Sequence, residues 1–180
     1  MDFLDLVKKR FSARKYKAAP VEREKIERCL EAARLAPSAS NSQPWHFIVL
    51  EDPVVKDQVA RQTFSTLLTF NKFVVQAPVL VVIVIEKPTL LSQIGGRVKN
   101  KEYPLIDIGI AAEHFCLQAT EVGLGTCMLG WFNEKSIKEL LKIPKEKTIG
   151  LIISVGYPDY ESVPPKKRKP LENIVSYNRY

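Results

Sequence analysis

The apolar residues of this chain fall into unbroken runs and amphipathic stretches, a combination that predicts a sheet covered by helices. Residues 79–85 form an unbroken run of Val, Leu and Ile, and residues 148–155 are almost as apolar. Because polar and apolar residues do not alternate in either run, we expect both faces of these strands to be buried. Two further strands are predicted at residues 45–50, which are rich in aromatic and branched side chains, and at residues 126–131. With the helices between them, these strands indicate an α/β or α+β fold.

Apolar residues at helical spacing predict the helices. Asp2 or Asp5 is expected to cap the first helix, Pro20 to lie in the first turn of the second, and Pro37 to follow its end. The predicted helices are residues 3–11, 20–35, 53–75, 105–122 and 133–141. The fourth of these is apolar almost all round, so we expect it to be buried on several sides, either centrally or in a subunit interface.

Two segments lack a clear helix or strand pattern. Residues 88–104 contain Gly95–Gly96 between two prolines and are predicted to form a long loop, of the kind that often serves as a lid. From Pro158 onward proline and charge dominate, so residues 158–180 are predicted to be a C-terminal extension of a single domain that spans residues 1–180. The apolar residues near the end of this extension favour a tail that lies on a neighbouring surface rather than a disordered one.

The composition is that of an ordinary globular protein, with 46% hydrophobic and 26% charged residues. No apolar run reaches the length that spans a membrane, and the acidic start of the chain does not resemble a signal peptide. Cys29, Cys116 and Cys127 are odd in number and form no C-x-x-C pair, which argues against a disulfide framework or a zinc site. We therefore expect three buried cysteines, no metal, no membrane contact and a cytoplasmic location.

Two basic clusters account for the net charge of +7. Residues 8–17 carry six positive charges and no acidic residue, and residues 166–169 carry four more, so the rest of the chain is slightly acidic. Arg10, Ser12 and Arg14 alternate and would point the same way in an extended segment, where the two guanidinium groups could grip a phosphate. The alternatives are a nucleic-acid backbone or a solvated charged turn.

The usual catalytic signatures are absent from the sequence. It has no G-x-G-x-x-G after a strand, no phosphate-binding P-loop, no H-E-x-x-H and no G-x-S-x-G. His46 and His114 are far apart in sequence, and His114 is expected to be a core or interface residue. No side chain stands out as catalytic, so we expect a bound cofactor to supply the reactivity.

The polar loop at residues 37–47 is the strongest candidate for contacting such a cofactor. Its sequence, P-S-A-S-N-S-Q-P-W-H-F, gathers hydroxyl and amide groups before an aromatic residue, between a predicted helix and a predicted strand. These groups can hydrogen-bond a flat ligand that is rich in heteroatoms. An ordinary connection built from turn-forming residues is the alternative.

The ordered set of motifs resembles the nitroreductase family of flavin enzymes. R-x-S-x-R at residues 10–14 is followed by P-S-x-x-N-x-Q-P-W and then by Ala-Pro before the central apolar strand. D-I-G-I-A-A-E at residues 107–113, E-V-G-L-G-T-C at residues 121–127 and K-K-R-K-P-L-E-N-I at residues 166–174 complete the series. The resemblance covers nearly the whole chain. It implies an α+β fold with a central, mostly antiparallel sheet flanked by helices, and a homodimer in which the C-terminal tail embraces the partner subunit.

The resemblance also implies FMN bound at the subunit interface. The cofactor-binding residues that it implies are Arg10, Phe11, Ser12, Arg14, Pro37, Ser38, Ala39, Asn41, Asn71, Leu129, Gly130, Lys166 and Arg168. The basic residues and Ser12 would contact the phosphate and ribityl chain, and residues 37–41 would come from the other subunit. Leu129 and Gly130 would offer backbone donors to the ring, with Asn71 at its edge. An acidic residue often precedes the glycine in the family, and Leu129 stands there in this chain.

The implied activity is that of an FMN-dependent oxidoreductase. NADH or NADPH would reduce the flavin, and a nitroaromatic, quinone or similar small-molecule acceptor would then be reduced in the same pocket, so the kinetics would be ping-pong. Alternatives are a flavoprotein of the same fold that destroys flavin or removes a halogen, and a flavin-binding protein without turnover. A nucleic-acid-binding module is a further alternative. However, the aromatic residues are not interleaved with Lys and Arg as stacking platforms would be, so no nucleic-acid partner is expected.

Overall fold

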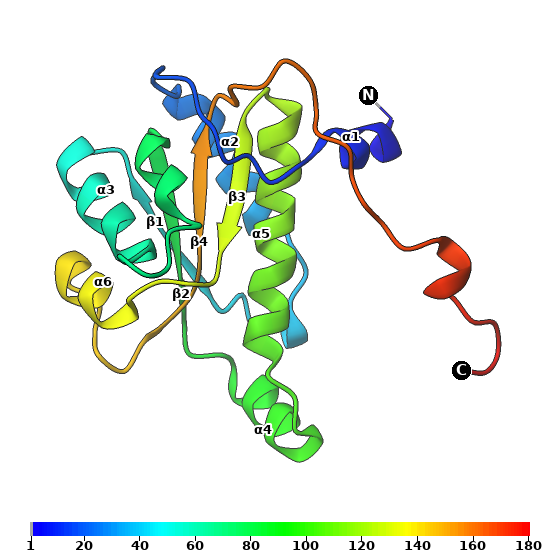
Figure 1. The fold of residues 1–180 in the computed structure, drawn as a ribbon. Coiled ribbons are helices and arrows are strands. Elements are labelled where there is room, and N and C mark those ends of the chain that lie inside the picture. The colour runs from blue at the N-terminus through cyan, green and yellow to red at the C-terminus, as the bar shows by residue number, and fades with distance from the viewer. Residues whose placement is uncertain (1) are drawn as a thin grey trace.

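A four-stranded antiparallel sheet with helices on both faces forms the centre of the computed structural model, which describes residues 2–180 apart from the side chains of Leu91 and Arg97 (Figure 1). The strands are β1 (Trp45–Leu50), β2 (Val79–Ile85), β3 (Gly125–Leu129) and β4 (Thr148–Gly156), in the spatial order β1-β2-β4-β3. Every neighbouring pair is antiparallel. The structure therefore confirms the α+β class and the antiparallel sheet.

The described residues also form six α-helices and four short 3-10 turns. The helices are α1 (Phe3–Lys9), α2 (Arg23–Arg34), α3 (Pro53–Ala60), α4 (Leu90–Lys99), α5 (Tyr103–Glu121) and α6 (Glu134–Leu141). The 3-10 turns are η1 (Ala39–Asn41), η2 (Arg61–Thr63), η3 (Lys72–Gln76) and η4 (Leu171–Asn173). Side-chain caps fix several helix starts: Asp2 accepts the Leu4 N–H and Asp52 accepts the Val54 N–H.

The hydrophobic core occupies both faces of the sheet, because the side chains of β2 alternate between two clusters. Leu80, Val82 and Val84 belong to the cluster that α3 and α6 cover. The intervening residues belong to the cluster that α2 and α5 cover. Both faces of the unbroken apolar strand are therefore buried, as its sequence predicts. None of the described helices is both long and apolar enough to cross a lipid bilayer.

Two predicted helix boundaries are wrong. The second helix begins at Arg23 rather than at Pro20, because the first helical hydrogen bonds run to the Glu22 carbonyl. The helix predicted over residues 53–75 ends at Ala60 and is followed by η2 and η3. Thr63 ends it, since its hydroxyl donates to the Ala60 carbonyl at 2.7 Å and competes with the helical backbone bonds.

The loop predicted over residues 88–104 instead contains α4. Leu90, Ile94 and Val98 recur every four residues, which is a helical spacing that the two glycines and flanking prolines obscured in the sequence. Thr89 supplies the start, since its Oγ1 accepts the Ser92 N–H at 3.4 Å. The next helix, α5, begins at Tyr103, slightly earlier than predicted.

Gly156, at the end of β4, allows two rigid rings to pack against the strand. A Cβ at this position would lie 2.6 Å from Cδ of Pro78 and 2.9 Å from Cδ1 of Tyr16. Tyr16 is buried, and its hydroxyl donates to the Ala13 carbonyl at 2.9 Å. The end of β4 and the N-terminal segment therefore meet too closely for any side chain at residue 156.

We expect Gly156→Ala to lower the free energy of unfolding by about 1–3 kcal/mol, because neither ring can move without displacing its backbone. Urea denaturation measures this loss. Gly95→Ala is the control, since its added Cβ would meet only Tyr103 Cε2 at an ordinary 3.8 Å. Equal stability of the Gly156→Ala and wild-type proteins would contradict the packing described here.

Candidate functional site

The basic N-terminal segment is extended and lies along the start of β3. Ser12 forms a parallel bridge with Thr126, and the Ala13 N–H donates to the Thr126 carbonyl at 2.9 Å. Gly125 permits this approach, because a Cβ there would lie 2.8 Å from the Ala13 Cβ. The pairing keeps the segment extended, the conformation that the alternation of Arg10, Ser12 and Arg14 requires.

Residues that follow β4 bind the same segment. The Lys17 N–H donates to the Tyr157 carbonyl at 2.9 Å, and the Asp159 N–H donates to the Lys15 carbonyl at 3.0 Å. Lys15 and Asp159 also form an exposed ion pair at 2.8 Å. We call residues 12–17 and 157–160 together the clasp. It places the first part of the C-terminal tail beside the N-terminal basic cluster.

Tyr160 joins the two strands of the clasp at the candidate site itself. Its hydroxyl accepts the backbone N–H of Arg14 at 2.9 Å. Its ring packs edge-on against Phe11, with the ring centroids 5.0 Å apart. Sequence reasoning missed Tyr160, since its two partners lie more than 140 residues away and no local pattern links them.

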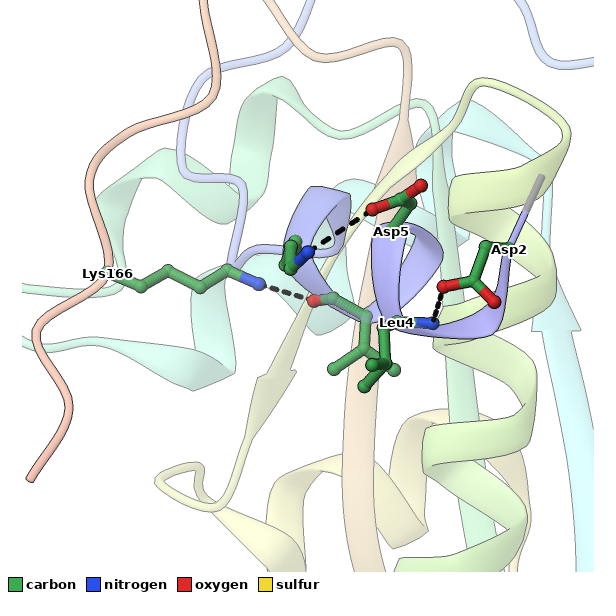
Figure 2. Close-up of polar contacts among 6 residues, drawn as sticks. Asp2, Leu4, Asp5 and Lys166 are labelled. Atoms are coloured by element: carbon green, nitrogen blue, oxygen red, sulfur yellow. Dashed lines mark hydrogen bonds and ion pairs between the residues drawn. The ribbon is translucent and has the colours of Figure 1, made fainter. Parts of the chain in front are cut away.

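The tail then brings further cations to the N-terminal cluster. Lys166 reaches back to α1, where its Nζ donates to the Val7 carbonyl at 2.5 Å (Figure 2). Partial burial lowers the pKa of Lys166, and the nearby charges of Arg10 and Arg168 lower it further. Basic residues from both ends of the sequence therefore gather at one place, as the two basic clusters predicted.

Among the described residues, Glu113 is the carboxylate that pairs with this group of cations. Arg10 Nε pairs with Glu113 Oε1 of α5 at 3.2 Å, and the Arg10 side chain is only 19% exposed. Glu113 also acts on Lys166 and opposes the lowering of its pKa. Arg10, Lys166 and Arg168 thus carry three positive charges against one negative charge, and two remain without compensation.

A small cavity of about 280 Å³ lies at the far end of β3. Its lining includes Arg14, Asn71, Gly130 and Trp131. Asn71 is buried, and its amide donates to the Thr63 carbonyl at 3.1 Å and to the Trp131 carbonyl at 3.3 Å. The side chain of Leu129 belongs to the core, so only its backbone is available to the cavity. Asn71 therefore fixes the chain that follows β3.

The loop predicted to contact the cofactor has an unusual backbone. Ser40, Asn41 and Gln43 have φ values of 53°, 50° and 46°, in the left-handed region that residues other than glycine rarely adopt. Ser38 Oγ accepts the Gln43 N–H at 2.9 Å, and the Gln43 amide donates to Asn41 Oδ1 at 3.2 Å. Pro37 is exposed just after α2. The loop therefore holds a defined shape rather than an ordinary turn.

This loop is also tied to two helices. The Ala39 N–H donates to Asp107 Oδ1 of α5 at 3.0 Å. On the other side, the Thr89 N–H at the start of α4 donates to Ser42 Oγ at 2.9 Å. The segment quoted above as D-I-G-I-A-A-E contains Asp107, but its spacing gave no hint of this contact.

The two halves of the candidate site lie on different faces of α5. Asp107 anchors the polar loop and Glu113 faces the cations, and these residues are about 9 Å apart along the helix axis and about 120° apart around it. Among the hydrogen bonds and ion pairs of residues 2–180, none joins the clasp to the loop at residues 37–43. One chain links Arg10 to Glu113, Lys166 to α1 and Arg14 to Tyr160, and none of these contacts involves the polar loop.

The cysteines and His114 are structural. All three cysteines are free and buried, and burial raises the pKa of both Cys29 and Cys116 to about 12. Their thiols are therefore protonated and poorly reactive near neutral pH. His114 Nδ1 lies 3.3 Å from the Ala32 carbonyl, between α5 and α2. The expectation for the cysteines is confirmed, and His114 is half-buried where α5 meets α2.

Comparison with protein-family models matches residues 7–157 to the model described as Nitroreductase family. The chain belongs to the nitroreductase family. An FMN-dependent nitroreductase from Clostridium difficile R20291 is similar in structure, with a TM-score of 0.81 and 31% identity over 99% of this chain and 100% of that chain.

Two curated relatives extend the comparison across most of the sequence of this nitroreductase family member. The iodotyrosine deiodinase of Thermotoga neapolitana is 30% identical, covering 98% of this chain and 97% of that protein. The oxygen-insensitive NADPH nitroreductase of Helicobacter acinonychis is 27% identical, covering 86% of this chain and 85% of that protein. The family resemblance seen in the sequence motifs is confirmed.

Tyr160→Phe should loosen the backbone at Arg14. The change keeps the ring that packs on Phe11 but removes the oxygen that accepts the Arg14 N–H, so we expect a loss of about 1 kcal/mol in protection of that amide. Hydrogen exchange of the Arg14 amide measures it. Tyr177→Phe serves as the matched control, because Tyr177 is 85% exposed. Unchanged exchange in Tyr160→Phe would show that this bond does not hold the segment.

Proposed function

We propose that this protein is an FMN-dependent oxidoreductase that takes electrons from NADH or NADPH and reduces conjugated acceptors such as nitroaromatics or quinones. The observation that carries the proposal is the group of cations next to the clasp. Arg10, Lys166 and Arg168 carry two positive charges beyond what Glu113 compensates. A phosphate monoester, the terminal group of FMN, carries about −1.5 to −2 charges at neutral pH. The charges of the site and of the phosphate therefore match.

The hydrogen-bond donors around these cations also suit a phosphate. Guanidinium groups bind phosphate oxygens with two parallel hydrogen bonds, and the Ser12 hydroxyl adds a neutral donor. Lys166 donates to a backbone carbonyl, and its pKa is lowered, so an anion nearby would stabilise its charged form. Arg14 and Phe11, both fixed by Tyr160, would support the ribityl chain.

The cavity at the end of β3 would receive the flavin ring. The exposed Gly130 offers its backbone N–H, and Leu129 contributes only backbone because its side chain is buried. Asn71 would act at the ring edge while its amide holds residue 131 in place. Bound FMN would supply the hydride chemistry between the nicotinamide and the acceptor, so the protein needs to bind and orient rather than to transfer protons itself. A shared pocket for both substrates would give ping-pong kinetics.

We further propose that the working unit is a homodimer. Pro37, Ser38, Ala39 and Asn41 belong to the loop that Asp107 of α5 anchors, and they would contact the cofactor held mainly by the partner subunit. Exposed apolar side chains on the tail would cover the partner: Leu171 (67% exposed), Ile174 (62%) and Tyr177 (85%). Burial of such residues is favourable, which supports a tail that embraces the second subunit. The three reduced, buried cysteines fit a cytoplasmic location.

Reductive removal of a halogen is a second candidate reaction. The iodotyrosine deiodinase of Thermotoga neapolitana matches this chain over 98% of its length. Both reactions would use the same reduced cofactor, and they differ in the acceptor that the pocket admits. Product analysis with a nitroaromatic and with an iodinated phenol, each under NADPH, distinguishes the two.

The absorbance spectrum of the purified protein tests the proposed function. We expect the absorbance bands of a bound flavin, and bleaching of these bands when NADH or NADPH is added without oxygen. Addition of a nitroaromatic or quinone should restore them. A colourless protein that takes up no added FMN would refute the proposal. A flavin that binds but is not bleached would indicate binding without turnover.

An Arg14→Ala variant shows whether the cofactor uses the clasp. Loss of a charged donor should weaken FMN binding about tenfold or more, and the wild-type affinity should fall as salt is added. Arg34→Ala is the matched control, because Arg34 is exposed and pairs only with Glu31 of its own helix. If Arg14→Ala retains FMN as tightly as the control, the assignment of Arg14 to the cofactor is wrong.

Removal of residues 170–180 tests the role of the tail in the homodimer. This truncation keeps Lys166 and Arg168 but removes the exposed apolar side chains that would cover the partner. We expect light scattering to find a dimer for the full chain. The truncated chain should form a weaker dimer, which becomes monomeric at protein concentrations where the full chain is still dimeric. A flavin-loaded monomer of the full chain would contradict the shared site.

A further inference from the structure

Asp107 is an unusual residue for the middle of a buried helix face. Its side chain is only 3% exposed, and one oxygen, Oδ2, has no hydrogen-bond partner among the described residues. The other oxygen accepts a single bond, from the Ala39 N–H at 3.0 Å. A buried carboxylate with so few partners is unfavourable, and an apolar residue of similar size would often be more stable at such a position. Packing alone therefore does not account for an aspartate there.

The strained backbone of the polar loop does account for it. Three residues of this loop, Ser40, Asn41 and Gln43, adopt left-handed φ values, and each such residue is strained by about 1–3 kcal/mol when it is not glycine. The loop keeps this shape only if bonds outside it hold it. Asp107 supplies the one such bond that comes from the rigid helix α5. The second outside bond, from Thr89 to Ser42 Oγ, comes from the short segment that precedes α4.

The position of the Asp107 bond makes it effective. Ala39 begins η1, directly before the first left-handed residue, so the bond fixes the point where the loop leaves its extended entry at Ser38. Asp107 lies in the second turn of α5, inside a continuous helix of 19 residues. Without the carboxylate, the entry to the loop would be free to relax toward ordinary backbone angles.

We infer that Asp107 is the positioning residue that holds the loop at residues 37–43 in the conformation that contacts FMN. This inference rests on the proposed function, since it assigns the loop to the cofactor. Asp107 itself touches neither cofactor nor substrate, and it acts through the Ala39 N–H. In the proposed homodimer, the carboxylate of one subunit would thus tune the site that the partner's cation group anchors.

Two substitutions and one control test the inference on the full-length protein. Asp107→Ala removes the acceptor, and Asp107→Asn keeps an oxygen of the same reach but loses the charge. Thr120→Val is the control, because Thr120 is a buried polar residue of the same helix whose hydroxyl bonds only to Cys116 of that helix. The readouts are hydrogen exchange of a peptide covering residues 37–43 in the FMN-free protein, and the Kd for FMN by flavin fluorescence.

We expect Asp107→Ala to speed exchange in this peptide and to raise the Kd about tenfold, as loss of a hydrogen bond to a charged group does. Asp107→Asn should recover most of both effects, and Thr120→Val should change neither. If Asp107→Ala does not fold, the comparison of Asp107→Asn with wild type still tests the inference. The peptide covering residues 37–43 should then exchange slightly faster in Asp107→Asn than in wild type. An Asn variant as weak as the Ala variant, or an Ala variant that matches wild type, would overturn the inference.

The two readouts separate this inference from the proposed function. If the wild-type protein binds no FMN, the proposed function fails, whereas the exchange measurement still reports on the bond between Asp107 and Ala39. If the wild-type protein binds FMN and Asp107→Ala binds it equally well, the function stands and the positioning role is refuted.

Discussion

The pairing of residues 12–17 with β3 on one side and with residues 157–160 on the other is the constraint on which the candidate site depends. It adds the N-terminal segment to the sheet through the Ala13–Thr126 bond, and it works only because Gly125 and Gly156 leave room for close contact. Since the same pairing aligns the start of the tail, it also determines where Lys166 meets Arg10. A local backbone interaction thus assembles charges that are more than 150 residues apart in sequence.

Bringing these like charges together is unfavourable for folding. Like charges and partial burial both disfavour the charged form of Lys166, and its lowered pKa reports that cost. The pKa of Lys166 is lower in the folded state than in the unfolded state. Below the folded-state pKa the lysine is protonated in both states, and its charge then disfavours folding. Above the unfolded-state pKa it is neutral in both states, and this penalty disappears. An anion bound among the cations would remove the penalty at neutral pH, as expected for a binding site rather than a structural ion pair.

The sequence predicts the sheet well, because residues 79–85 and 148–155 can be stable only when buried on both faces, whatever the rest of the chain does. It also predicts the N-terminal part of the cation group, since six positive charges within residues 8–17 are evident from the sequence. Helix ends are predicted less well: a Thr63 hydroxyl bond ends α3, and Gly95–Gly96 hides the four-residue spacing of α4. Tyr160 and Asp107 could not be found at all, because each acts through a single backbone N–H that only the folded chain brings near.

The central helix α5 explains why such a site would need two subunits. Glu113 faces the cations and Asp107 holds the polar loop, about 120° apart around the same helix, so the two groups lie on different sides of α5 in one chain. In the proposed homodimer, each subunit would offer its loop to the cations of the other. Leu105 and Ile106 in the first turns of α5 are about half exposed, which leaves an apolar surface there for that copy to cover. The sequence predicts that α5 is apolar almost all round. One side of this helix packs in the core of its own chain, and another would pack against the second subunit that completes the cofactor site.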